Sequence, residues 1–268
     1  TKLLSGAEFT LFDLNGDLVD VMTTGEDGEA LLENLKPGKY YARETKAPEG
    51  YDLTDERFDV TIEAGKVTLL SGAPVKNEQL GSLTVIKSDK TNPLNLLKGA
   101  VYGVFADAAC TEKVGEVTTD ENGAGTLVGL KPGEYYVKEL KAPEGFDIDP
   151  EAYPAVVEPG KTTTSQVADY PLVGTLVISK AVEGADTDEA FQFTIALTLP
   201  DYASPADRYD ATLNGEDVGG VTFVVSGVER VARVTLKSDD VLTITGLPVG
   251  TRVTVTEEAN LRYVTTVN

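Results

Sequence analysis

Lysines and carboxylates are the residues of this sequence whose types and spacing could do chemistry. The 268 residues include no histidine, one cysteine, and 44 acidic against 23 basic residues. Without histidine, the sequence excludes Ser-His-Asp and Cys-His nucleophile systems, HExxH zinc sites and imidazole proton shuttles. Any reaction must therefore use amines, carboxyl groups, phenols or hydroxyls.

Three short segments alternate between apolar and polar residues, and in each of them a polar residue stands at the end of the apolar face. Because side chains two positions apart share one face of a strand, Lys87 continues the apolar face of LTVIK. By the same rule Glu139 continues that of YYVKE, and Asp169 that of SQVAD. An amine and two carboxyl groups could thus converge inside one β-sandwich. The alternative is that each residue ends its strand at the rim and is solvated.

The same pattern recurs elsewhere in the chain. This recurrence favours a shared chemical role over the alternative that each polar side chain is simply solvated at the edge of a sandwich. Polar residues again end alternating apolar segments at Glu44, Asn77, Lys180 and Glu257.

Internal repetition divides the chain. Residues 23–53 match residues 118–148 at a constant offset of 95, and the last part opens with GTLVISK, much as the second repeat opens with GSLTVIK. We therefore predict three domains, at residues 1–80, 81–173 and 174–268.

Short strands and turns predominate in all three predicted domains. LTVIK, YYVKEL, FQFTIAL and RVARVTL alternate between apolar and polar residues, and DLNGD, DENG and KPG between such segments are typical of turns. No segment keeps a helical period for more than a turn or two. The prediction is an all-β fold of tandem immunoglobulin-like β-sandwich domains.

The motifs resemble the collagen-adhesin B-type (CnaB, or SpaA-like) domains of Gram-positive pilins and surface adhesins. The first domain has LSGAEFTLF, LKPGKYYARETKAPEGY and PVKN, and the second has LTVIKSD, LKGAVYGVF, LKPGEYYVKELKAPEGF and VAD. The third resembles the related pilin isopeptide-linkage type through LVISK, AFQFTIAL and TGLPVGTRVTVTEE.

In that family, a first-strand lysine bonds covalently to an Asn or Asp side chain on the last strand, assisted by a buried Glu or Asp. The resemblance implies an isopeptide bond between Lys87 and Asp169 in the second domain, with Glu139 as the assisting acid. Such a bond is self-modification without turnover, so no enzyme activity, cofactor or metal site is expected.

The first domain departs from this pattern. It has Glu44 as the assisting acid and Asn77 as the acceptor, but the offset of 93 that relates residues 4–12 to 97–105 carries Lys87 to position −6. Lys2 lies in the following turn and is a poor substitute. We expect this domain to lack its first strand, or to receive it from another chain.

The third domain departs differently. The resemblance implies Lys180 as the amine and Glu257 as the assisting acid, but no acceptor follows in the expected place, and Asn268 is poorly positioned for that role. We expect this domain to be truncated at its C-terminal side.

Charge and hydropathy limit the partners. The formal charge of −21 argues against nucleic acid, and no apolar run is long enough for membrane insertion in this segment. The lone Cys110 excludes an intramolecular disulfide.

The sequence thus predicts a stalk or shaft segment of an extracellular, cell wall-anchored pilus or adhesin. Its partners would be other pilin subunits or adhesin domains in the same polymer. Two alternatives stay open: an adhesive module that binds a host protein or glycan, for which the polar insertion at 198–220 is a candidate, and a carboxylate-based hydrolase.

Overall fold

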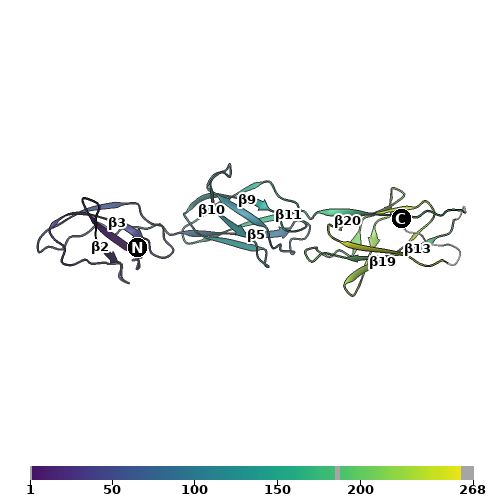
Figure 1. Ribbon diagram of the computed structural model, residues 1–268, viewed down its shortest axis with the longest axis horizontal. Helices are drawn as coiled ribbons and strands as arrows, with labels where there is room; N and C mark the ends of the chain where they lie inside the picture. Colours follow the sequence, from purple (N-terminus) through teal and green to yellow (C-terminus); the bar gives the residue numbers. More distant parts are fainter. Residues whose placement is uncertain (1, 185–187, 261–268) are drawn as a thin grey trace.

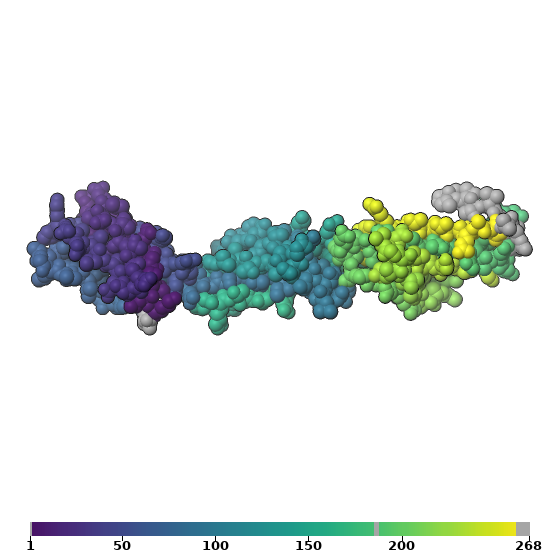
Figure 2. All heavy atoms as spheres, turned by 90° about the horizontal axis from the view of Figure 1, so that it is seen from below, coloured from purple at the N-terminus to yellow at the C-terminus, as the bar shows by residue number. Residues whose placement is uncertain are grey.

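The computed structural model describes residues 2–184 and 188–260 of the chain. These residues form strands and turns without a helix, so the all-β prediction is confirmed. Figure 1 shows three groups of strands that follow one another end to end in the order of the sequence, and the colours of the space-filling view in Figure 2 follow the same order along the molecule. None of the described residues forms a helix that is long and apolar enough to cross a membrane.

The first group is one antiparallel sheet with the strand order β2-β1-β3-β4. Its strands are β1 (Glu8–Asp13), β2 (Leu18–Thr23), β3 (Gly38–Lys46) and β4 (Arg57–Ile62). One face of this sheet carries the buried apolar residues, which are Ala7, Phe9, Leu11 and Ala42.

The second group is a sandwich of two sheets, with the strand orders β10-β9-β6-β7 and β11-β5-β8. Its strands are β5 (Gly81–Asp89), β6 (Val101–Phe105), β7 (Lys113–Thr118), β8 (Ala124–Leu130), β9 (Gly133–Lys141), β10 (Ala152–Val157) and β11 (Thr162–Asp169). The core between the two sheets includes Leu83, Val85, Tyr102, Val104, Val137 and Val167.

The third group contains two four-stranded sheets, β12-β20-β15-β16 and β18-β19-β13-β21, and the short pair β14-β17. Its strands are β12 (Val173–Ser179), β13 (Phe191–Thr198), β14 (Arg208–Tyr209), β15 (Ala211–Leu213), β16 (Glu216–Asp217), β17 (Val221–Thr222), β18 (Val224–Ser226), β19 (Glu229–Leu236), β20 (Val241–Pro248) and β21 (Arg252–Glu257). Phe191, Ile195, Phe223 and Ile244 lie in its core.

Strand β5 is the central strand of its sheet, paired in parallel with β11 and antiparallel with β8. Every second residue of β5 is buried, beginning with Gly81 and ending with Asp89. Leu83 and Val85 are completely buried, and each such side chain contributes about 1.5–3 kcal/mol to stability. This burial holds the register of β5 and therefore the inward direction of Lys87, since a one-residue slip would turn every side chain to the other face.

The KAPEG loop occurs in both of the first two domains. In each domain it is hydrogen-bonded to the segment that leads out of the domain. In the first domain Leu80 N–H donates a hydrogen bond of 2.9 Å to Gly50 O, and in the second Leu172 N–H donates one of 2.7 Å to Gly145 O. The same loop therefore directs the chain out of both repeats.

The insertion at 198–220 begins against the second domain. The ring of Tyr202 lies directly on Gly145, where a Cβ atom would collide with it, and it meets Phe146 edge to face with a centroid distance of 6.1 Å. Asn92 Nδ2 also donates a hydrogen bond of 3.1 Å to Ser204 Oγ. This part of the insertion is a joint between two domains.

Replacement of Tyr202 by alanine should loosen that joint, because it removes the ring that packs on Gly145 and Phe146. Aromatic pairs contribute about 0.5–1.5 kcal/mol beyond their buried area, enough to populate other orientations of the third domain. Small-angle X-ray scattering should show a broader distribution of maximum dimensions for the variant. The control is Tyr40→Ala, which removes a tyrosine of the first domain. An unchanged profile for a folded Tyr202→Ala protein would contradict this role.

Candidate cross-linking site

Lys87, Glu139 and Asp169 meet between the two sheets of the second domain. Lys87 lies near the end of the central strand β5, and the parallel register places it beside Val167 of β11. Asp169, two residues further along β11, therefore points to the same interior face. Glu139 reaches the site from β9 in the opposite sheet.

The Lys87 amine is in contact with three groups. Lys87 Nζ forms an ion pair with Asp169 Oδ1 and lies 3.2 Å from Glu139 Oε1. It also donates a hydrogen bond of 2.8 Å to the hydroxyl oxygen of Tyr102. The exposed fraction of the side chain is 0% for Lys87 and Glu139 and 1% for Asp169. Water is thus excluded from an amine that touches two carboxyl groups.

The two carboxyl groups are held differently. Glu139 Oε2 accepts a hydrogen bond of 2.8 Å from Asp149 N–H, which fixes the orientation of this side chain. Glu139 Oε1 and both oxygens of Asp169 are buried and accept no hydrogen bond from the described residues. Two of these oxygens, Glu139 Oε1 and Asp169 Oδ1, form ion pairs with Lys87. Desolvation of such groups costs several kcal/mol for each ion, so burial disfavours the charged forms of these groups.

Burial changes the proton affinities in the site. Desolvation is the largest cause that raises the pKa of Asp169 to about 6; the Lys87 contact opposes the shift, and Glu139 adds to it. Desolvation, followed by the charges of Glu139 and Asp169, raises the pKa of the Tyr102 phenol. Asp169 can therefore take up a proton near neutral pH, while Tyr102 keeps its own.

The sequence interpretation did not identify two groups of this site. Tyr102 is 1% exposed, and alternation in AVYGVF places it on the same face as Val104, so this pattern could have identified it. Its position in the first repeat is Phe9, which has no hydroxyl. Asp149 contributes its backbone N–H, which no side-chain pattern could have indicated.

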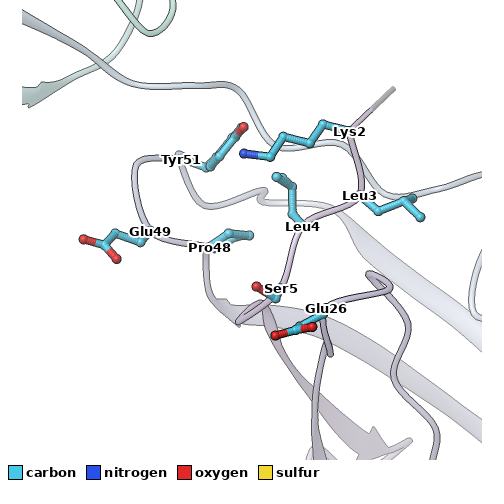
Figure 3. A pocket seen from close by; sticks show the side chains of 8 residues that line it. All are labelled: Lys2, Leu3, Leu4, Ser5, Glu26, Pro48, Glu49 and Tyr51. Carbon is cyan, nitrogen blue, oxygen red and sulfur yellow. The ribbon is translucent and has the colours of Figure 1, made fainter.

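In the first domain, a buried acid meets an amide, and no amine among the described residues forms an ion pair with that acid. Asn77 Nδ2 donates a hydrogen bond of 2.6 Å to Glu44 Oε2, and Thr54 N–H donates one of 2.9 Å to the same oxygen. Glu44 is only 3% exposed, yet its Oε1 has no hydrogen-bond partner among the described residues. Lys2 lines a surface pocket instead (Figure 3) and forms no ion pair with Glu44 in the part of the chain described.

The third domain holds an amine and an acid. Lys180 Nζ lies 2.9 Å from Glu257 Oε1, with 13% and 7% of the two side chains exposed. The same amine lies 4.2 Å from the centroid of the Phe191 ring. The structure thus brings Lys180 and Glu257 together, and the remaining candidate, Asn268, lies outside the described residues.

The Lys87→Met variant should lose stability as the pH rises. It cannot form an amide, and it lacks the cation that lowers the pKa of Asp169, so burial and Glu139 keep that pKa above its ordinary value of 3.8. The folded state then binds the proton more tightly than the unfolded state. The resulting stabilisation is complete below about pH 4 and is lost as the pH rises through 6 and above. A loss of about 2–3 kcal/mol is expected.

Urea unfolding at several values between about pH 4 and 8 would measure this loss. The control is Lys87→Met combined with Asp169→Asn, in which the acid is absent and the slope should be smaller. A free energy of unfolding that rises with pH in the single variant would contradict the assigned environment of Asp169.

Two family models match the chain. The SpaA model, described as a prealbumin-like fold domain, matches residues 1–72 and 81–171. Residues 174–268 match DUF7601, described as a domain of unknown function. The resemblance of the third domain to the pilin isopeptide-linkage type therefore stays a prediction.

Two curated relatives match parts of the chain, and the first is a surface protein by name. The trypsin-resistant surface T6 protein of Streptococcus pyogenes is 30% identical over 99 residues, which are 37% of this chain and 18% of that protein. The serine-aspartate repeat-containing protein F of Staphylococcus epidermidis is 27% identical over 254 residues, which are 89% of this chain and 14% of that protein. The chain thus spans less than a fifth of either relative.

Two solved structures also show some similarity to this chain. The Bacillus anthracis TIE protein has a TM-score of 0.49 and 25% identity, over 100% of this chain and 45% of that chain. BcpA, the major pilin subunit of Bacillus cereus, has a TM-score of 0.36 and 19% identity, over 67% of each chain. Because the SpaA model matches more than half of its residues, the chain belongs to the SpaA family of prealbumin-like fold domains.

Proposed function

We propose that this chain is a stalk or shaft segment of a Gram-positive pilus or adhesin, stabilised by an isopeptide bond that forms by itself between Lys87 and Asp169. One observation carries the proposal: a fully buried lysine amine touches the carboxyl group of Asp169 beside a second buried acid, Glu139. Membership of the SpaA family supports the pilus or adhesin role.

The reaction joins the amine to the acid and releases water. Transfer of one proton from the Lys87 ammonium to a carboxylate neutralises both groups, a change that burial favours because it penalises charge. The neutral nitrogen attacks Cγ of Asp169, and one C–N bond forms. One C–O bond then breaks, and the oxygen leaves as water with the two protons that the amine has lost. The net products are one amide and one water molecule.

The neighbouring residues have distinct roles in this reaction. Glu139 Oε1, 3.2 Å from Lys87 Nζ, carries protons from the amine toward the departing oxygen. The Asp149 N–H holds Glu139 in place, and the Tyr102 hydroxyl positions the amine. The folded core keeps the reactants adjacent, an effect that is worth up to about 7–11 kcal/mol. Because the amide ends the reaction, the site acts once and does not turn over.

The bond also explains how the domain would resist force. Lys87 and Asp169 lie on neighbouring parallel strands at the two ends of the domain sequence. A pull on both ends of the chain would pass directly from one residue to the other, and residues 88–168 would not extend. In the chain-entropy model, a cross-link that closes a loop of this length stabilises the fold by about 4–5 kcal/mol.

The location and partners follow from the same proposal. One relative is named as a surface protein, which supports an extracellular position on the cell surface, with anchoring to the cell wall. Other pilin subunits or adhesin domains of the same polymer would be the partners. The adhesive alternative placed a binding face on the insertion at 198–220, but Tyr202 and Ser204 of that insertion pack on the second domain.

Intact mass under denaturing conditions tests the bond. The folded chain should be lighter than its sequence by one water, and Lys87→Ala and Glu139→Gln should each restore the full mass. The free energy of unfolding should fall by about 4–5 kcal/mol in these variants. Lys180→Ala is the matched control and should keep the deficit. Full mass in a correctly folded parent chain would overturn the proposal.

A further inference from the structure

In each domain, a neighbouring strand places an aromatic residue directly opposite the predicted assisting acid. These antiparallel pairs are Phe9 with Glu44, Tyr102 with Glu139, and Phe193 with Glu257. All three aromatic side chains are buried, and of the three only Tyr102 carries a hydroxyl group. The two phenylalanines show that an aromatic ring without a hydroxyl fills this position. Packing alone therefore does not explain the hydroxyl group of Tyr102.

That hydroxyl group lies at the reacting nitrogen. Its oxygen accepts the hydrogen bond of 2.8 Å from Lys87 Nζ, so its own hydrogen is free to turn toward another acceptor. Glu139 Oε1 and both oxygens of Asp169 are buried and accept no hydrogen bond from the described residues. After desolvation, the charges of these two carboxyl groups are the largest causes of the raised pKa of Tyr102. The phenol thus lies near the amine and near both carboxyl groups.

The bond-forming reaction removes two protons from this nitrogen. The Lys87 ammonium group has three hydrogens, and the amide product keeps one. Glu139 faces the amine with Oε1 alone, since its Oε2 is held by the Asp149 N–H. A single oxygen of a carboxyl group must release one proton before it takes up the next, whereas a hydroxyl group can give one proton while it accepts another. The second transfer therefore suits Tyr102.

We propose that the Tyr102 hydroxyl is a catalytic group of this reaction, which gives its proton to the departing oxygen of Asp169 as it takes one from the Lys87 nitrogen. This role rests on the proposed function. Glu139 carries the first proton to a carboxyl oxygen of Asp169, and the nitrogen then attacks Cγ. Tyr102 passes its own proton to the same oxygen and accepts one from the nitrogen, the C–O bond breaks, and water leaves. The phenol ends as it began, and the products are one amide and one water molecule.

A phenol suits this role because it stays neutral in the buried site. Its raised pKa keeps the proton on Tyr102 before the reaction, and a simultaneous exchange of two protons requires no phenolate. In a Tyr102→Phe chain, the ring can pack as Phe9 and Phe193 do, but Glu139 must carry both protons in succession. General acid–base catalysis contributes about 100- to 10,000-fold. The variant should therefore form the same bond, but more slowly.

Timed bond formation in newly made chains tests this role. Cell-free translation of the whole chain is stopped, samples are quenched in denaturing acid at intervals, and mass spectrometry follows the loss of water. Tyr102→Phe should lose water at least about 100-fold more slowly than the parent and reach the same final mass. Tyr135→Phe is the matched control, since its hydroxyl donates to Lys131 O at 2.9 Å, and its rate should equal that of the parent. The temperature is chosen so that folding, timed by protease protection of Lys87→Met, precedes the loss of water.

Fluorinated tyrosines at position 102 separate catalysis from packing. Analogues with more ring fluorines have more acidic phenols and almost the same shape. They should lose water faster as the acidity of the phenol increases, because the departing oxygen receives the proton of the phenol. A rate that stays constant or falls along the series overturns the catalytic role, as does a Tyr102→Phe chain that reacts as fast as the parent. In either case a water deficit in the parent leaves the proposed function intact, whereas a folded parent that never loses water rejects both.

Discussion

The interaction on which this structure depends is the contact of a buried lysine amine with two buried carboxyl groups. An isolated charge in that position would cost far more than a domain of this size can offset. The amine of Lys87 is tolerated because Asp169 and Glu139 reach it from two other strands. Amide formation would remove the charge pair altogether. The same burial that makes the ion pair expensive therefore favours its conversion into a neutral bond.

The position of β5 determines where such chemistry is possible. As the central strand of a three-stranded sheet, β5 brings its lysine between the two sheets and also holds β8 and β11 in place. The described residues of the first domain include the sheet β2-β1-β3-β4 and the buried acid Glu44, but no strand that corresponds to β5. Strand β5 thus supplies the reactive amine and is also the hydrogen-bonding partner of both other strands in its sheet.

Much of the site could be predicted from alternation and repetition. The alternation in LTVIK, YYVKE and SQVAD indicated that Lys87, Glu139 and Asp169 face inward, and each is buried. Two features could not be predicted. The Asp149 N–H that orients Glu139 belongs to a loop whose path no side-chain pattern specifies. The packing of Tyr202 on Gly145 joins residues of different domains, and the sequence carries no signal for that contact.

The sequence by itself determined the all-β fold, the repeats and the faces on which the reactive residues lie. These properties depend on local periodicity, since a strand turns alternate side chains to opposite faces. Only the tertiary structure decided which of those residues meet. Lys87 meets an acid and an acceptor, Glu44 meets the amide of Asn77, and Lys180 meets an acid at 2.9 Å. Strand pairing and sheet packing set these distances, and periodicity along one strand does not specify its neighbours.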